Sequence, residues 1–279
     1  MEKVLLVIDA SQIDTNTLDF ACHIANLAHS KLTGIFLENV QEKIFAAAPY
    51  MYGDTFSQFA VEKPVPNLEE LKKQYDENIR AFKERCAKNN TGCSVYRDRG
   101  VPINEVIHES RFADLLILDA KTSFDRQNKS APTDFAKKVL ATAECPVIIA
   151  PEHFNTVEEI LFAYDGSASS VFAIKQFTYL FPGLDEKTVT LLQVNEGEHS
   201  RVEDRLKIAE WLKSHFSAIN IMTLNGTVKN ALFGYLVDKK NTIVVMGAYG
   251  RSSVSQFFKG SSADPIIKAV NLPVFIAHH

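Results

Sequence analysis

The chain repeats itself, and this repeat constrains the fold more than any other feature of the sequence. The stretch KVLLVIDAS (3–11) matches EILFAYDGS (159–167), because each is an apolar run that ends in Asp, one small residue and Ser. Likewise, ADLLILDA (113–120) matches NTIVVMGA (241–248), and ECPVIIAP (144–151) matches NLPVFIAHH (271–279). Matches in the same order at this distance predict a tandem duplication. We place one domain at 1–151 and the other at 157–279, with an insertion of about 29 residues, 39–67, in the first.

Apolar strands alternate with helical patterns in each copy. In the second copy, continuous Val, Ile and Leu runs predict strands over 159–164, 188–195, 218–224, 242–247 and 273–277. The segments between them predict helices over 168–180, 201–216, 229–240 and 264–270. Strands that are apolar throughout are typical of a parallel sheet covered on both faces. The fold class is therefore α/β, with two tandem doubly wound parallel-sheet domains of the nucleotide-binding type.

The insertion at 39–67 precedes a long predicted helix, about 68–89. It mixes Ala, Pro and aromatic residues without clean periodicity, which is typical of a flap or a packing arm. Five large apolar side chains favour instead a lid or a surface for a protein partner, because they are costly to expose: Tyr50, Met51, Tyr52, Phe56 and Phe59. We expect 41–66 to be the least ordered part of the chain, or to fold over a neighbouring surface.

Composition excludes several classes of protein. Of the 279 residues, 30 are Lys or Arg and 34 are Asp or Glu, so the net charge of −4 argues against a general nucleic-acid binder. No apolar run approaches the ~20 residues of a membrane span. The four cysteines form no CxxC pair, and we expect them to be reduced in a cytoplasmic protein.

The stretch GAYGRSSVSQFFKGSS (247–262) has the chemistry of a phosphate site. It lies between a predicted strand and a predicted helix, where ligands bind at the carboxyl edge of a parallel sheet. Glycines let the backbone approach a ligand closely, and free N–H groups at a helix N-terminus bind phosphate. The cationic and hydroxyl side chains of this stretch add charge and hydrogen-bond donors: Arg251, Lys259, Ser261 and Ser262. If their spacing is left aside, Gly247, Gly250 and Gly260 could equally be ordinary turn and helix-entry residues.

The spacing Gly-x2-Gly-x9-Gly-Ser, at Gly247, Gly250, Gly260 and Ser261, resembles the signature of the universal stress protein family in its ATP-binding branch. The resemblance covers nearly the whole chain, taken as two family domains that would pair through their last strands as a pseudo-twofold dimer within one chain. Two such chains could in turn form a homodimer. The resemblance implies that the glycines and serines hold ribose and phosphates, with ATP as the ligand.

The same resemblance implies roles for residues at the ends of two other strands. Asp165, with Gly166 and Ser167 beside it, would hold the nucleoside, and Val194 would line the adenine site as a buried residue. Asp165 and Ser167 are equally good helix N-caps, and both roles can coexist. Asp264 would repel phosphates unless Mg²⁺ lies between them.

The matching stretch of the first copy, DAKTSFDRQNKSAPTDFAKK (119–138), has none of the glycines, and no Gly occurs from 101 to 165. Alignment places four polar residues where the signature lies: Asp119 at Gly247, Thr122 at Gly250, Thr133 at Gly260 and Asp134 at Ser261. We therefore expect the first domain to have lost the nucleotide, or to bind something else. Asp9 and Ser11 would remain as strand-end and helix-cap residues.

No sequence motif suggests efficient catalysis. The leading hypothesis is a cytoplasmic stress-response protein that binds one ATP in its second domain as a switch or sensor, with unidentified protein partners. The alternatives are a slow ATPase or phosphotransfer protein, and a scaffold that binds partners but no nucleotide. On the leading hypothesis, Gly260→Val weakens ATP binding, whereas Thr133→Val leaves it nearly unchanged.

Overall fold

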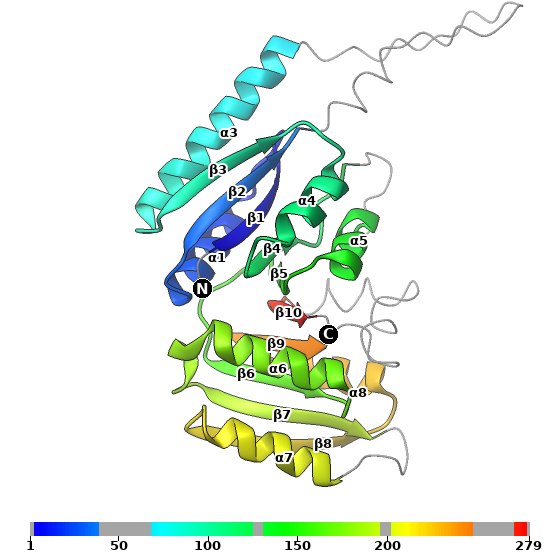
Figure 1. Ribbon diagram of the computed structural model, residues 1–279. Coiled ribbons are helices and arrows are strands. Elements are labelled where there is room, and N and C mark those ends of the chain that lie inside the picture. The colour runs from blue at the N-terminus through cyan, green and yellow to red at the C-terminus, as the bar shows by residue number, and fades with distance from the viewer. Residues whose placement is uncertain (1–2, 39–67, 125–130, 196–201, 248–270, 278–279) are drawn as a thin grey trace, which may run out of the picture.

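The computed structural model describes residues 3–38, 68–124, 131–195, 202–247 and 271–277 (Figure 1). The insertion at 39–67 lies outside the described residues, as do the predicted helix 264–270 and most of the glycine stretch. The predictions made for these three segments therefore stay predictions.

The described elements alternate between strand and helix along the chain, as the apolar runs predict. The first half contains β1 (Lys3–Asp9), α1 (Thr15–Leu27), β2 (Lys31–Leu37), α3 (Leu68–Lys88), β3 (Cys93–Asp98), α4 (Pro102–Ser110), β4 (Leu115–Asp119), α5 (Asp134–Thr142) and β5 (Val147–Ala150). The second half contains β6 (Glu159–Tyr164), α6 (Ala168–Leu180), a 3₁₀ turn η1 (Pro182–Leu184), β7 (Thr188–Asn195), α7 (Val202–Lys213), β8 (Ala218–Asn225), α8 (Val228–Leu236), β9 (Thr242–Gly247) and β10 (Val274–Ala277).

The described strands form one 10-stranded sheet in the order β3-β2-β1-β4-β5-β10-β9-β6-β7-β8. Strands β1 to β5 are parallel to one another, and so are β6 to β10. The order of the second half is that of the first, read outward from the centre. This arrangement confirms the predicted α/β class and the repeat of one unit.

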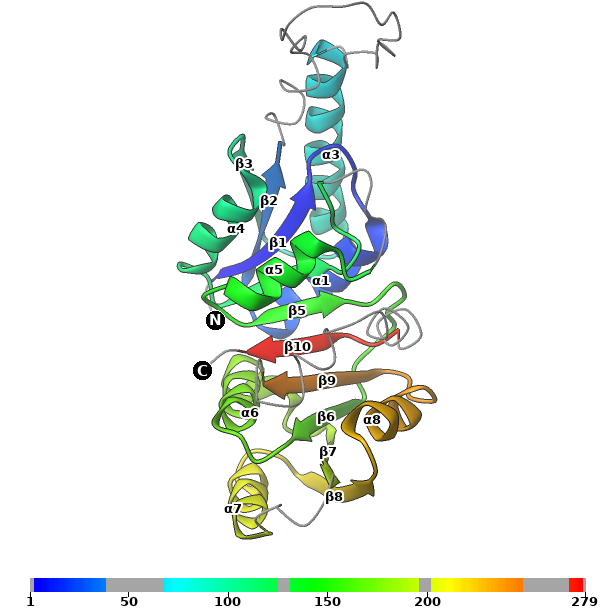
Figure 2. The ribbon, with the colours of Figure 1, turned by 90° about the vertical axis from the view of Figure 1, so that its right-hand side faces the viewer.

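The two halves meet where β5 and β10 pair in antiparallel register, at the centre of the sheet (Figure 2). Phe275 lies opposite Ile148, and Val274 lies opposite Ile149. The prediction that the last strands pair within one chain is thus confirmed. Because strand direction reverses at this junction, the carboxyl ends of the two halves lie on opposite edges of the sheet.

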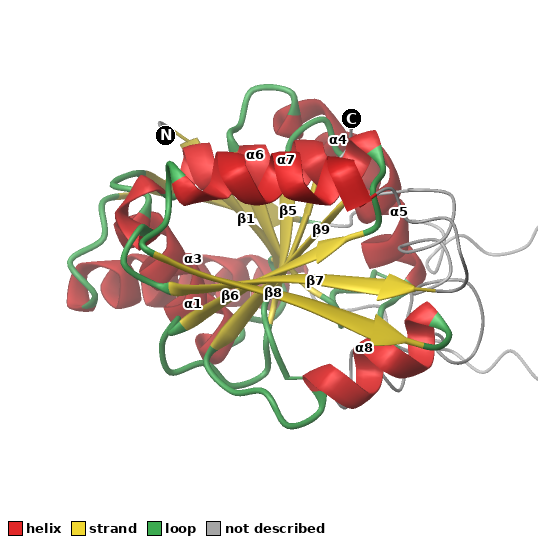
Figure 3. Ribbon diagram, turned by 90° about the horizontal axis from the view of Figure 1, so that it is seen from below, coloured by secondary structure: helices red, strands yellow, loops and turns green. Residues whose placement is uncertain are grey.

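Helices cover both faces of the twisted sheet (Figure 3). Helices α1, α3, α6 and α7 contribute buried residues to one hydrophobic cluster, and α4, α5 and α8 contribute to the other. Strand residues alternate between the clusters, since successive side chains of a strand point to opposite faces. In β4, for example, Leu115 and Ile117 belong to the first cluster and Leu116 and Leu118 to the second.

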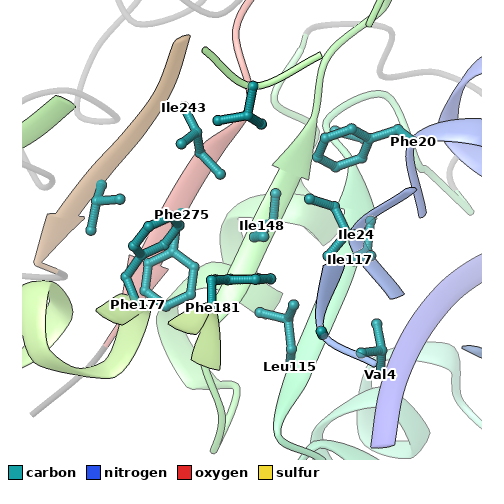
Figure 4. Packing of buried hydrophobic residues seen from close by; sticks show 14 of the residues in the cluster. Val4, Phe20, Ile24, Leu115, Ile117, Ile148, Phe177, Phe181, Ile243 and Phe275 are labelled. Atoms are coloured by element: carbon teal, nitrogen blue, oxygen red, sulfur yellow. The ribbon is translucent and has the colours of Figure 1, made fainter. Parts of the chain in front are cut away.

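The first cluster is continuous across the junction. Phe275 of β10 and Phe177 of α6 pack edge to face at a centroid distance of 5.3 Å, close to Ile148 of β5 (Figure 4). Phe177 and Phe275 are fully buried. The two halves therefore share one hydrophobic core on this side of the sheet.

Candidate functional site

The turn that follows β6 is built from three predicted site residues. Gly166 has φ +79°, a left-handed conformation that favours glycine. The backbone N–H of Ser167 donates to Asp165 Oδ1 at 2.9 Å. Ser167 is the N-cap of α6, where its hydroxyl accepts from the N–H of Ser170 at 3.1 Å. Asp165 and Ser167 thus have the local structural role that the sequence left open, which does not conflict with ligand binding.

Gly247 ends β9 beside this turn. A Cβ at Gly247 would lie 2.4 Å from the carbonyl carbon of Ser169 and 2.5 Å from the nitrogen of Ser170. Both atoms belong to the backbone of the first turn of α6, so only glycine lets the helix lie this close to the strand. The structure therefore brings Gly247 together with 165–167 at the carboxyl edge, where β6 and β9 are neighbours.

This point of the sheet has the topology of a ligand site. From β6 the chain proceeds outward to β7, while β9 lies on the other side of β6. Ligands of open α/β sheets bind at such switch points, beyond the carboxyl ends of the strands. The geometry of the turn and of Gly247 therefore agrees with the location that the sequence predicts.

Val194 lies near the end of the neighbouring strand β7, opposite Leu224 of β8. Its position places it beside the turn after β6, since Tyr164 is the register partner of Gln193. The side chain is half-buried, whereas the sequence led us to expect a fully buried one. Val194 is the second-last residue of β7, so it lies close to the carboxyl edge of the sheet.

The other predicted site residues lie outside the described part of the chain: Gly250, Arg251, Gly260, Ser261 and Ser262.

Sequence reasoning did not single out a group of buried polar atoms near Val194. Three side-chain atoms are buried and have no hydrogen-bond partner among the described residues: Gln193 Oε1, Asn195 Oδ1 and Arg205 Nε. Arg205 Nη1 donates to Thr223 Oγ1 at 2.8 Å, and Thr223 is the strand partner of Gln193. The signal in the sequence was the pair of carboxamides that ends the otherwise apolar run LLQVN. Because successive side chains of a strand face opposite sides, Gln193 and Asn195 lie on the α7 face of β7 and Val194 lies on the other face.

The equivalent edge of the first half carries carboxylates instead of glycines. Asp119 ends β4 at the position that matches Gly247. Burial raises the pKa of Asp119, and the charges of Asp14 and Glu152 raise it further, against a hydrogen bond of 2.8 Å from the N–H of Lys121. A cleft of about 260 Å³ lies here, between β1 and β4, and Asp9, Asp14 and Asp119 are among its lining residues. Asp9 has a counterpart in Asp165, whereas Asp14 and Asp119 take the places of Ser167 and Gly247. These two added carboxyl groups disfavour a polyphosphate, although Lys121 also lines the cleft.

Two first-half positions have structural roles. Asp14, not Ser11, is the N-cap of α1, so the predicted cap role of Ser11 is wrong. The N–H and hydroxyl of Ser11 instead donate to Asp9 Oδ1 at 2.8 and 2.7 Å. The reason is that α1 begins six residues after Asp9, whereas α6 begins three residues after Asp165. Thr133, the counterpart of Gly260, is the N-cap of α5, where Oγ1 accepts from the N–H of Ala136 at 3.1 Å. Its hydroxyl also donates to the carbonyl of Thr122.

Comparison with known proteins agrees with this architecture over the full length of the chain. No protein-family model matches the sequence. The chain is 22% identical over 292 residues to the universal stress protein Slr1230 of Synechocystis, and the alignment covers 98% of this chain and 99% of that protein. The chain is therefore similar over nearly its whole length to a curated universal stress protein.

Solved structures of universal stress proteins have the same fold as this chain. A universal stress protein from Archaeoglobus fulgidus superposes with a TM-score of 0.69 at 15% identity, covering 99% of this chain and 98% of that one. A putative universal stress protein from Pseudomonas aeruginosa gives a TM-score of 0.59 at 15% identity, covering 99% and 92%. Among the described helices, none combines the length and apolar character needed to cross a bilayer.

Proposed function

We propose that this chain is a universal stress protein that binds one adenine nucleotide, ATP, at the carboxyl edge of its second half, and that occupancy of the site acts as a switch or sensor. The observation that carries the proposal is the convergence of Gly247, the first glycine of the signature, with the turn 165–167. The remaining signature residues, Gly250, Arg251, Gly260, Ser261 and Ser262, follow directly in the chain from Gly247. They would supply backbone N–H groups, hydroxyls and one cation to the phosphates.

The nucleoside would occupy the space between the turn and the end of β7. Asp165 and Val194 would contact ribose and adenine, as the family resemblance implies. The buried polar atoms of Gln193, Asn195 and Arg205 lie on the α7 face of β7 and are enclosed by protein, so they are not part of the proposed nucleoside site.

One nucleotide per chain follows from the contrast between the two carboxyl edges. The first half presents Asp14 and Asp119 at its edge, in the places of Ser167 and Gly247, and has no glycine from 101 to 165. On this basis we propose domains at 1–151 and 157–279, of which only the second retains the site. In the second half, Mg²⁺ would be needed to offset Asp264.

On this proposal the protein is cytoplasmic and does not hydrolyse the nucleotide. Its partner is an unidentified protein. A slow ATPase, or a scaffold that binds no nucleotide, remains the alternative. Adenine absorbance of the gently purified protein, followed by a turnover assay with ATP, separates the three. Nucleotide without turnover supports the switch, measurable turnover supports the ATPase, and protein free of nucleotide that ignores added ATP supports the scaffold.

The decisive variant is Gly260→Val, measured by titration calorimetry with and without Mg²⁺. A side chain at 260 would project into the phosphate space, so we expect affinity to fall by more than tenfold, or about 1.4 kcal/mol. Gly247 variants are less informative, because packing against α6 already requires glycine there.

The matched control lies at Thr133, the first-half counterpart of Gly260. Thr133→Val, the control suggested by the alignment, would remove the cap of α5. Thr133→Ser keeps the hydroxyl and should leave ATP affinity unchanged. Two equivalent sites in the wild type, or tight binding by Gly260→Val, would contradict a single site built on the glycine stretch.

A further inference from the structure

Three of the four cysteines meet in the first half, far along the sheet from the proposed nucleotide site. Cys22 of α1 and Cys86 of α3 are 64 residues apart in the chain, yet their Sγ atoms lie 3.9 Å apart. Both side chains are buried, and both thiols are free. Cys93, the first residue of β3, is half-buried and packs against the same cluster. The thiol of Cys93 neighbours that of Cys86, so Cys86 is the middle member of the group.

Polar contacts hold the two helices together on either side of the thiol pair. Arg85 of α3 forms an ion pair with Asp19 of α1, one position from Cys86 and three from Cys22. Farther along, Asn26 Nδ2 donates to the carbonyl oxygen of Asn89 at 3.0 Å. Because α1 and α3 are fixed at these points, the sulfurs stay close. A disulfide needs about 2.05 Å between them, so the gap to close is about 2 Å.

The pKa values of the two buried thiols, Cys22 and Cys86, are shifted in opposite directions. The hydrogen bond with Cys86 lowers the pKa of Cys22, against the effect of burial. The contact with Cys22, burial and the neighbouring Cys93 thiol all raise the pKa of Cys86. When the pair loses a proton, the thiolate therefore forms on Cys22, and the thiolate is the nucleophile in thiol chemistry.

We propose that Cys22, Cys86 and Cys93 form a thiol relay that a hydroperoxide oxidises, with a buried Cys22–Cys86 disulfide as the product. Cys93 is the accessible member. Its thiolate attacks one peroxide oxygen, the O–O bond breaks, and the alcohol or water leaves with the thiol proton, which gives a sulfenic acid. The Cys22 thiolate then takes the proton of the hydrogen-bonded Cys86 thiol, so that the Cys86 sulfur can attack the Cys93 sulfur. The hydroxyl leaves as water with that proton, which returns Cys22 to the thiolate form.

The last step moves the bond inward. The Cys22 thiolate attacks Cys86, a Cys22–Cys86 disulfide forms, and Cys93 leaves as a thiolate that takes up the proton released by Cys22. In sum, two thiols and one hydroperoxide give one disulfide, one alcohol and one water. The product links α1 to α3 and closes a loop of chain that includes 39–67.

Cys145 provides a control within the same chain. It is buried, and burial, helped by the charge of Asp114, raises the pKa of its thiol to about 12. No other cysteine contacts it in the described structure, so it has neither a reactive thiolate nor a partner. We expect Cys145 to remain reduced.

The test is treatment of the full-length protein with hydrogen peroxide, followed by a thiol count in denaturant and mass mapping of non-reduced peptides. The expected product has two of four thiols left and a Cys22–Cys86 bond. A bond to Cys145, disulfides only between chains, or Cys93 oxidised to sulfinic acid with no disulfide would overturn the relay. Four surviving thiols would overturn it too.

Variants test each step. Cys145→Ser should oxidise as the wild type does. Cys93→Ser should slow formation of the disulfide by tenfold or more, and an unchanged rate would overturn the role of Cys93.

Cys22→Ser should stop at a Cys86–Cys93 bond, whereas that bond as the final wild-type product would overturn transfer to Cys22. Cys86→Ser should form no disulfide within the chain. If a buried serine prevents folding, Cys86→Ala, which leaves no unpaired hydroxyl, replaces it.

Discussion

Gly247 has no side chain, and the backbone of Ser169 and Ser170 occupies the space that a methyl group would need. This glycine therefore has a packing role that is independent of any ligand. It sets how closely the first turn of α6 approaches the end of β9. The same turn carries Ser167, so the packing also positions the loop of the proposed nucleotide site.

We predict that Gly247→Ala destabilises the protein by about 1–3 kcal/mol, the usual cost of overpacking a close contact. Backbone atoms cannot move aside as a flexible side chain can, so α6 must shift. Urea denaturation measures the change. Gly234→Ala is the control, because no atom lies within 4 Å of its added Cβ. It lies within helix α8, where Ala is favoured over Gly by about 1 kcal/mol. Equal stability of Gly247→Ala and the wild type would contradict the packing role.

Glu159, at the start of β6, joins several elements of the second half. Its Oε2 accepts from Lys239 Nζ at 2.7 Å and Thr242 Oγ1 at 3.3 Å, and its Oε1 accepts from Thr190 Oγ1 at 2.8 Å. Burial alone would raise the pKa of Glu159, but these hydrogen bonds and the Lys239 charge lower it overall. The charged form therefore stabilises the amino ends of β6, β7 and β9.

We predict that Glu159→Gln lowers the free energy of unfolding by roughly 1–3 kcal/mol at neutral pH. Because the folded-state pKa is lowered, this stabilisation is present above the ordinary carboxyl pKa of about 4.3 and is lost as pH falls below it. The difference between variant and wild type should thus shrink towards pH 3 in denaturation curves. Glu84→Gln, in an exposed pair with Arg80, should change little at any pH. A deficit of Glu159→Gln that stays constant down to pH 3 would contradict the linkage.

Most elements could be predicted from the sequence, because fully buried strands are apolar throughout and helices are not. The predicted range 168–180 matches α6, and 242–247 matches β9. The start of α1 could not be located, because Ser11 and Asp14 are both good caps and only the length of the loop decides between them. The meeting of Cys22 and Cys86 was equally hidden, since it depends on how α3 packs on α1. For the candidate site, the sequence predicted Gly247 and 165–167 together. It did not reveal the buried polar atoms of Gln193 on β7 and Arg205 on α7, because only the packing of α7 on the sheet brings them together.

The whole molecule is organised around one sheet and a shared core, although its sequence consists of two copies. The β5–β10 pairing and the cluster around Phe177, Ile148 and Phe275 connect the halves. A domain boundary usually has few contacts across it. Here the contact is a strand pair at the centre of the sheet, so unfolding of one half exposes core residues of the other.

We predict that the protein unfolds in one transition. The single tryptophan, Trp211 on α7, reports on the second half, whereas far-UV circular dichroism reports on both. Their urea curves should coincide. Phe275→Ala should move both curves to lower urea together, with a loss of about 3–5 kcal/mol for a buried Phe. Separate midpoints for the two probes would show that each half unfolds by itself.

The reversal of strand direction between β5 and β10 also bears on how a duplicated protein can diverge. The carboxyl edges of the two halves lie on opposite sides of the sheet, so mutations that change the loops at one edge do not touch the loops at the other. The first half can therefore carry Asp119 and the helix cap Thr133 where the second half has glycines, without any effect on the second half's loops. The two halves share the central strand pair, and the loops at each carboxyl edge can change separately.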